Sequence, residues 1–398
     1  MKKFLNRVQK FILSAAGFTT TLIMLLIIIF LFQNGLSLFN QKPLEEATAI
    51  VTSADVKDLT LTDLEIKDIF DGKIINWKEV GGDDKEIIIA SLDDVVANAT
   101  EEELGANMEH IGLVINKYFL EHEGIISFFP EKYLDKKFPG KSIDLKKITP
   151  LHFLTGKEWF PTAKPVSQLG VLPLILGSIW VSIGAIILAL PFGLMVAIFL
   201  SEIAPSKVKT IIKPLIELLA GIPSVVYGFF GLVVLVPLVQ KTFHLDVGET
   251  ALTGSLILAI MALPTIISIA EDSISSVPKV MREASLALGA SKWQTIYRVV
   301  IPYASSGITS AIILGIGRAM GETMAVLMVT GNSAIIPHTF LQPVRTIPAT
   351  IAAELGEAPY GGLHFKALFA LGCILFILTL LFNIYVSYIK FKNRRISA

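Results

Sequence analysis

Two charged side chains, Arg318 and Glu322, stand in a stretch, 303–331, that contains no other Asp, Glu, Lys or Arg. They are four residues apart, which predicts one helix face near the middle of the stretch, with the Thr323 hydroxyl close by. Arginine keeps its charge and presents a fork of N–H donors, so it suits an anion such as phosphate. Glu322 would hold or neutralise it. The alternative is a buried ion pair that only fixes helix packing.

A second pattern lies in a loop at 279–302. Arg282, Glu283 and Ala284 are followed by Gly289, and nine residues later by a Val-Val-Ile-Pro sequence that ends at Pro302. This order predicts a short helix, a turn at the glycine and a second helical piece that enters a span. An exposed helix of this kind can dock into a groove on a partner protein. The alternative is an ordinary amphipathic connector.

The elements that must position these residues are membrane helices. Of the 398 residues 53% are hydrophobic and 17% are charged, whereas soluble domains are about 25% charged. Six stretches are long and apolar enough to cross the hydrocarbon layer as helices, namely 11–41, 165–201, 218–240, 250–270, 303–331 and 367–389. We therefore expect an all-α membrane protein with six transmembrane helices. The first is too long to be a signal peptide and is expected to remain uncleaved.

The segment 42–164 has a different composition from the spans. It holds 24 of the 34 acidic residues and 15 of the 34 basic ones, which leaves it about nine charges negative. Strand-like runs at 87–89 and 113–115, and a helix-like stretch at 63–70, predict a small α+β domain. The expected organisation is residues 1–41 for the N-terminus and first helix, 42–164 for an insert, and 165–398 for a five-helix core.

Basic residues gather on one side of the expected spans. They lie at the N-terminus, in the loops after the second and fourth spans, and at the C-terminus, with 15 lysines and arginines in total. The positive-inside rule therefore predicts cytoplasmic termini and an extracytoplasmic insert, in a multi-pass protein of the bacterial inner membrane.

Several kinds of chemistry have no support in this sequence. A G-x-x-x-x-G-K-[ST] phosphate loop is missing, so we expect neither ATP hydrolysis nor any other enzymatic activity from this chain. The six histidines are scattered, and Cys373 is the sole cysteine, so no bound metal or other cofactor is expected. Membrane lipid is the expected surrounding, and no nucleic acid is expected as a partner.

The 279–302 pattern resembles the EAA loop of ABC importer permeases, with Ser285 in place of the second alanine. Gly315–Val326, Leu219–Phe230 and Phe153–Val181 resemble the phosphate-specific branch of that family, its C-type subunit. The resemblance covers about 1–41 and 150–398. It implies a permease paired with a homologous A-type subunit, two cytoplasmic ATPases that carry ATP and Mg, and an extracytoplasmic phosphate-binding protein. It also implies that Arg318, Glu322 and Thr323 lie on the phosphate path, and that the loop couples to the ATPase.

The insert departs from the usual C-type subunit, which has a shorter loop there. Its segment Leu59–Ile89 is similar to part of a phosphate-binding protein. The insert contains no arginine and is acidic, so docking or gating is favoured over a phosphate site of its own; a structural cap is the third possibility. Two other functions remain open from the sequence: a permease for another oxyanion (molybdate, sulfate or phosphonate), and a phosphate-sensing membrane protein.

Overall fold

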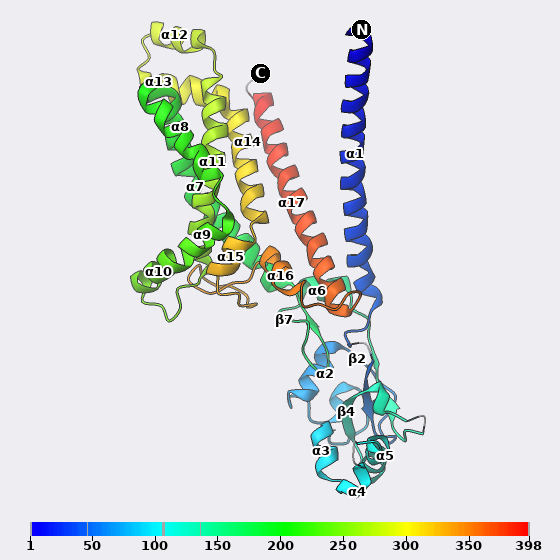
Figure 1. Cartoon of the computed structure of the whole chain (residues 1–398). Coiled ribbons are helices and arrows are strands. Elements are labelled where there is room, and N and C mark those ends of the chain that lie inside the picture. Colours follow the sequence, from blue (N-terminus) through cyan, green and yellow to red (C-terminus); the bar gives the residue numbers. More distant parts are fainter. Residues whose placement is uncertain (1, 46, 106–107, 136, 397–398) are drawn as a thin grey trace. The chain divides into compact units, whose positions relative to one another are not determined.

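The computed structural model describes residues 2–45, 47–105, 108–135 and 137–396, with the backbone alone for 2–9, 101 and 389–396. The chain divides into two compact units, whose elements are labelled in Figure 1. The first comprises Met1–Val171 and Glu357–Ala370, and the second comprises Leu172–Gly356 and Leu371–Ala398. The last long helix, α17 (Leu363–Ile396), thus contributes its beginning to the first unit and its remainder to the second.

Six helices in the described part of the chain are long and apolar enough to cross a membrane, which confirms the predicted all-α membrane protein. They are Lys10–Asn40, Leu172–Ile203, Ser224–Phe243, Ala251–Ser275, Lys292–Gly321 and Leu363–Tyr388. The fifth ends at Gly321 and not near 331 as predicted. That difference changes the geometry of the candidate site.

The second unit holds four of these spans, most of the sixth, and the short helices that connect them. Its elements, besides the remainder of α17, are α7 (Leu172–Ile198), η4 (Phe199–Ile203), α8 (Ser206–Ala220), α9 (Ser224–Phe230), η5 (Gly231–Leu235), α10 (Val236–Phe243), α11 (Ala251–Ser275), α12 (Lys279–Ala287), α13 (Lys292–Thr295), η6 (Ile296–Val300), α14 (Ile301–Gly321), α15 (Met324–Val329) and α16 (Ile347–Glu354). Figure 1 shows α12 and α13 at one end of this unit, and α10, α15 and α16 at the other.

The helix α11 forms the centre of the second unit and packs against both α7 and α14. Small residues permit this close packing. A Cβ added at Gly315 of α14 would lie 2.8 Å from a side-chain carbon of Ile266 on α11, so a larger residue would push the helices apart. Close approach through small residues is typical of helix pairs in membranes.

Three π-helical turns, η4, η5 and η6, interrupt the described spans. The turn η4 extends α7 and carries Glu202, and η6 leads into α14. Single π-turns inside helices are rare and often mark functional positions. Both η4 and η6 lie beside the loop that contains α12.

The first unit contains α1 (Lys2–Leu36), the start of α17 and a small mixed α/β insert. The elements of the insert region are η1 (Ser37–Asn40), β1 (Thr48–Thr52), β2 (Thr60–Leu61), α2 (Asp63–Phe70), η2 (Trp77–Val80), β3 (Ile88–Ile89), α3 (Leu92–Ala97), α4 (Glu101–Leu104), α5 (Ile111–Glu121), β4 (Ile125–Pro130), η3 (Glu131–Tyr133), β5 (Lys141–Ser142), β6 (Asp144–Leu145), α6 (Pro150–Thr155), β7 (Trp159–Phe160) and β8 (Gln168–Leu169).

The main sheet of the insert has the strand order β3-β4-β1-β5, with β1 antiparallel to both neighbours and β3 parallel to β4. Side chains of a strand alternate between the two faces of a sheet. Accordingly, Val51 of β1 packs in a core with α3 and α5, whereas Ile50 packs in a second core with α2. The sheet is therefore covered by helices on both faces, as a small α+β domain requires.

Local signals explain part of the insert. The Thr62 hydroxyl accepts the Glu65 N–H at 3.2 Å and the Glu65 carboxylate accepts the Thr62 N–H at 2.7 Å, a capping box that begins α2. The predicted helix at 63–70 is confirmed, and β3 falls within the predicted strand-like run. The predicted strand at 113–115 is wrong. It lies inside α5, because Ile111, Val114 and Phe119 recur at helical spacing and are buried together.

Candidate functional site

The fifth span breaks next to the predicted arginine–glutamate pair. The helix α14 ends at Gly321, and Glu322 has an extended backbone, with φ −71° and ψ 135°, before α15 begins at Met324. The prediction that Arg318 and Glu322 share one helix face near mid-span is therefore wrong. Glycine favours such a break because it stabilises a helix poorly. The Glu322 carboxylate lies 3.4 Å from the Ala325 N–H and accepts it at the start of α15.

Arg318 has no hydrogen-bonded or ionic partner within the described residues, although its charge acts on the nearby Tyr227 side chain. Its side chain is exposed on the last turn of α14, and it forms neither a hydrogen bond nor an ion pair there. Glu322 and Thr323 are half-buried beside it, and the Thr323 hydroxyl donates to the Gly321 carbonyl at 3.3 Å. A locking ion pair between Arg318 and Glu322 is thus absent, and the guanidinium keeps all its donors for another group.

Glu322 lines a narrow pocket with hydroxyl groups from two other elements. Ser178 and Ser182 line it from α7, and so does Thr346, the residue that directly precedes α16. Ser178 also accepts the Ile347 N–H at 2.9 Å and so fixes the start of α16 against α7. The break after α14 is therefore bordered by polar groups, although it lies among apolar helices.

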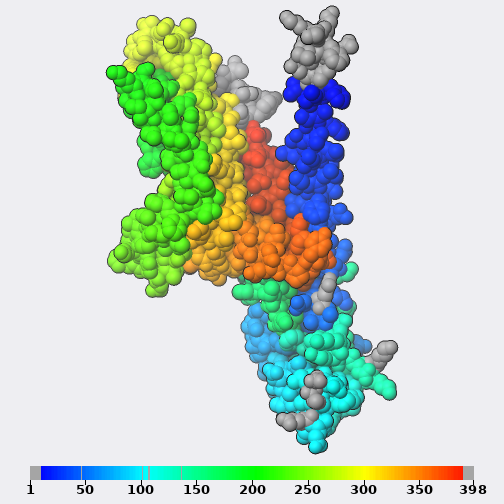
Figure 2. All heavy atoms as spheres, in the orientation of Figure 1, coloured from blue at the N-terminus to red at the C-terminus, as the bar shows by residue number. Residues whose placement is uncertain are grey.

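The second predicted set of residues lies around α12. Arg282, Glu283 and Ala284 are on this helix, Gly289 follows it and Pro302 lies in the first turn of α14. Gly289 has φ +85°, a left-handed conformation that glycine adopts without strain. Glu283, Ala284 and Gly289 are exposed, and Figure 2 shows this segment, in yellow, at the surface. The predicted helix–turn–helix order is present.

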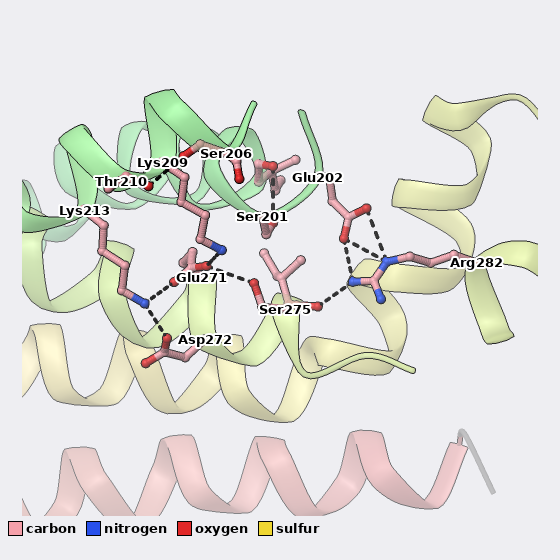
Figure 3. Close-up of polar contacts among 12 residues, drawn as sticks. Ser201, Glu202, Ser206, Lys209, Thr210, Lys213, Glu271, Asp272, Ser275 and Arg282 are labelled. Carbon is pink, nitrogen blue, oxygen red and sulfur yellow. Dashed lines mark hydrogen bonds and ion pairs between the residues drawn. The ribbon is translucent and has the colours of Figure 1, made fainter. Parts of the chain in front are cut away.

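Arg282 joins α12 to the ends of two spans (Figure 3). Its Nε and Nη2 donate to Glu202 Oε1 at 3.0 and 2.6 Å, and Glu202 is carried by η4. The same guanidinium donates to the Ile274 carbonyl at 2.9 Å, in the last turn of α11, and to the Val277 carbonyl. One side chain thus ties the exposed helix to both α7 and α11 with charge-assisted hydrogen bonds, which are stronger than neutral ones.

A buried carboxylate lies one turn before this contact. Glu271 of α11 is 2% exposed and accepts from Lys213 Nζ at 2.7 Å, from Lys209 Nζ, and from the Ser275 hydroxyl at 2.9 Å. Both lysines belong to α8, and Lys213 also meets Asp272 at 2.9 Å. Hydrogen bonds to Glu271 and then to Asp272 raise the pKa of Lys213, so it stays charged at neutral pH.

These six ionic side chains form a balanced group. Three carboxylates, of Glu202, Glu271 and Asp272, face three cations, of Lys209, Lys213 and Arg282 (Figure 3). Charges that are taken out of water are tolerated when each is paired and hydrogen-bonded. The six side chains form two ionic groups near the end of α11. One joins Glu202 of η4 to Arg282 of α12, and the other joins Glu271 and Asp272 of α11 to both lysines of α8.

The structure keeps the two predicted sites apart. Seventeen residues of α14 separate its first residue from Arg318, which at 1.5 Å per residue is roughly 25 Å. The exposed arginine and the α12 region thus lie toward opposite ends of one helix. Any communication between them runs along packed helices.

Sequence reasoning found Arg282 but missed Glu202, Lys209, Lys213 and Glu271. Glu202 and Glu271 directly follow the apolar runs 165–201 and 250–270. Hydropathy therefore marks them only as the positions where two spans end. The signal that could have identified them is an acidic residue at the lysine-rich end of a span, where nearby basic side chains can pair with it. In this chain, charged residues at the ends of spans form buried contacts, so they are as informative as charged residues in the middle of a span.

The ion pair between Glu202 and Arg282 leads to a stability prediction. Glu202→Ala leaves the guanidinium without its carboxylate in a site where the two side chains are 9% and 19% exposed. Breaking a buried pair costs about 3 kcal/mol, so we expect the free energy of unfolding to fall by that amount and the melting temperature of the assembled protein to fall with it. Asp246→Ala, which removes an exposed carboxylate, is the control. Equal melting temperatures for both variants would contradict the prediction.

Part of this chain is similar to known proteins. The family described as binding-protein-dependent transport system inner membrane component matches residues 189–395. A probable ABC transporter permease protein, YqgH of Bacillus subtilis, is 41% identical over 247 residues, which cover 62% of this chain and 80% of that relative. The phosphate transport system permease protein PstC of Mesorhizobium japonicum is 42% identical over 248 residues, which cover 58% and 75%.

One solved structure is similar to a smaller part of this chain. It is a putative phosphate ABC transporter substrate-binding protein with bound phosphate, from Clostridium perfringens. It is 26% identical and covers 28% of this chain and 51% of that protein, with a TM-score of 0.20.

Proposed function

The chain belongs to the family of binding-protein-dependent transport system inner membrane components, and we propose that it is the permease subunit of an ATP-driven phosphate importer. The observation that carries the proposal is its 42% identity over 248 residues to a permease named for phosphate transport. The exposed Arg318, free of protein partners in the described residues, is the feature of the chain that suits an anionic substrate.

The proposed path runs past the break between α14 and α15. Irregular backbone at membrane depth is tolerated where it is buried in protein or lines an aqueous cavity. Arg318 stands at this break with its five N–H donors unused, and the Thr323 hydroxyl lies near it. Phosphate would exchange its water for these donors, and Glu322 would limit how long the anion stays. Transport then needs binding that is strong enough for entry and weak enough for release.

The proposed coupling element is α12 with the turn at Gly289. Val280, Leu288 and Trp293 are 70, 89 and 63% exposed there, an unusual density of apolar side chains on a surface helix and its turn. Such a surface suits a groove on a partner protein. We assign that groove to an ATPase subunit, which would bind ATP and Mg, since this chain lacks a phosphate loop. We propose an alternating-access mechanism, in which the permease opens to one side of the membrane at a time. Closure of the two ATPase subunits would move α12 and so switch the open side.

The remaining partners follow from the family. Its description names dependence on a binding protein, and for this chain we propose a phosphate-binding protein on the outer side. A homologous A-type permease would complete the pathway. The protein is a multi-pass membrane protein with six apolar helices. We further propose cytoplasmic termini, because lysine and arginine gather on that side, and an extracytoplasmic insert that docks or gates the binding protein.

Uptake of radiolabelled phosphate tests the proposal. The chain would be expressed with its permease, ATPase and binding-protein partners in cells that lack their own phosphate transporter, with excess molybdate and sulfate as competitors. We expect uptake that requires this chain and resists both competitors. The control is the same set of partners without this chain.

Other outcomes would replace the proposal. Uptake that molybdate or sulfate suppresses would identify a permease for another oxyanion. An assembled complex that moves none of these anions, but changes gene expression when phosphate is withdrawn, would identify a sensor.

A further inference from the structure

The helix α8, which links the second and third spans, is poorly held by packing. None of its side chains is fully buried. Its apolar residues Ile211, Leu215 and Leu218 are 64, 55 and 69% exposed. Since apolar stabilisation scales with the area removed from water, these residues contribute little to fixing α8 against the rest of the chain. The half-buried Val208, Ile212 and Ile216 supply part of the attachment, and a further interaction adds to it.

That interaction is the attachment of α8 to Glu271. Two lysines of α8, one turn apart, reach the same carboxylate on α11 (Figure 3). The carboxylate is 2% exposed, whereas both lysines are about one-third exposed. Ser275 supplies the third hydrogen bond to Glu271. The anion is thus the fixed member of the cluster, and the lysines bring α8 to it.

The helix α12, the proposed coupling element, is also attached to the end of α11. Arg282 of α12 donates to the Ile274 carbonyl, which lies three residues after Glu271 on α11. The last turns of α11 therefore receive α12 on one side and α8 on the other. The chain continues from α8 through Gly221 and Pro223 into α9, which begins the third span at Ser224. A displacement of α12 can reach the third span by this route, provided that α8 stays attached.

We propose that Glu271 is a positioning residue for transport, which fastens α8 to the end of α11 so that the coupling helix moves the third and fourth spans together. The inference rests on the proposed function. Loss of the attachment would leave α12 able to follow the ATPase, while the third span lags behind it. ATP would then be hydrolysed without a matching movement of phosphate.

The test is Glu271→Gln in the assembled importer, with Asp272→Asn as the matched control. Glutamine keeps the shape of the side chain and removes the charge that holds both lysines. Asp272 is the neighbouring residue, also contacts Lys213 and is 66% exposed, so its charge is largely screened by water. Phosphate uptake and ATP hydrolysis are measured on the same reconstituted vesicles. Amide hydrogen exchange is followed in residues 206–220.

For Glu271→Gln we expect hydrolysis within about twofold of the unmodified protein and uptake reduced at least about tenfold, a loss of the size seen when a buried charge pair is broken. Exchange in residues 206–220 should rise by a similar factor, while residues 251–265 stay protected. Asp272→Asn should reduce uptake and protection of α8 far less than Glu271→Gln does, because Lys213 keeps its contact with the buried Glu271. Equal proportional losses of uptake and hydrolysis, or unchanged exchange in α8, would overturn the proposal.

A second variant covers the case in which Glu271→Gln does not assemble. Lys213→Met removes one of the two lysines and leaves Lys209 to neutralise Glu271, so the fold is spared an unpaired buried charge. It should give an intermediate loss of uptake per ATP. If the unmodified importer moves no phosphate, the proposed function fails, but the exchange contrast in α8 still decides whether Glu271 holds this helix.

Discussion

Arg318→Ala is expected to lower phosphate uptake by about 100-fold in a complex that still assembles. The estimate follows from the 2–5 kcal/mol that a desolvated charged partner typically contributes to binding an oppositely charged group, roughly 30- to 4,000-fold. Assembly should survive, because Arg318 is exposed and makes no hydrogen bond or ion pair with the described residues. The measurement is uptake of radiolabelled phosphate, normalised to the amount of purified complex.

Two further variants define the role of this guanidinium. Arg318→Lys keeps the charge but loses the planar fork that matches phosphate oxygens, and it should recover part of the uptake. Lys241→Ala removes an exposed cation of α10 away from the break and should leave uptake near normal. Failure of Arg318→Ala to assemble would instead show that Arg318 supports the fold.

Gly289→Val is expected to weaken the proposed contact with the ATPase by distorting the turn after α12. A β-branched residue at φ +85° is strained by about 1–3 kcal/mol, and the turn is expected to rearrange to relieve that strain. Steric clash is not the cause, since no atom lies within 4 Å of a Cβ added at this position. We expect phosphate-stimulated ATP hydrolysis to fall at least about tenfold, a loss of roughly 1.4 kcal/mol.

Gly289→Asn is the matched control for this effect. Asparagine adopts left-handed backbone conformations far more readily than valine, so it places a side chain on the same surface with little strain. Hydrolysis should stay within a few-fold of normal. Equal losses for asparagine and valine would mean that the exposed surface, and not the backbone of the turn, determines docking.

The spans were predictable from the sequence because membranes exclude charge. Each of the six predicted stretches corresponds to a helix; the bounds of the first, fourth and sixth agree within about five residues, whereas the fifth is displaced by about ten toward the N-terminus. The break at Gly321 was not predictable in this way. The inference that Arg318 and Glu322 share a face assumed a continuous helix, and hydropathy is the same for a helix and for a short extended link between two helices. Local glycine content, at Gly317 and Gly321, was the available clue.

In the candidate site, the residues of a linear motif were predictable from the sequence, whereas their distant partners were not. Arg282 and Gly289 were found because a linear pattern contains them. The partners of Arg282 were not found, since Glu202 lies 80 residues away along the chain and Ile274 contributes only a carbonyl. The Glu271 cluster likewise joins elements separated by about 60 residues. Contacts of this kind depend on how the helices pack, which spacing alone does not reveal.

The π-turn η4 has a consequence for how the length of this segment can vary. Successive residues of an α-helix are rotated by about 100°, so a turn with one extra residue shifts the phase of everything after it by that amount. Glu202 sits within this shifted part, at Phe199–Ile203, and there it meets Arg282. Deleting a single residue between Gly193 and Glu202 would restore the regular phase and carry the carboxylate around the helix, away from its partner. Insertions and deletions here are therefore constrained even where individual side chains are free to change.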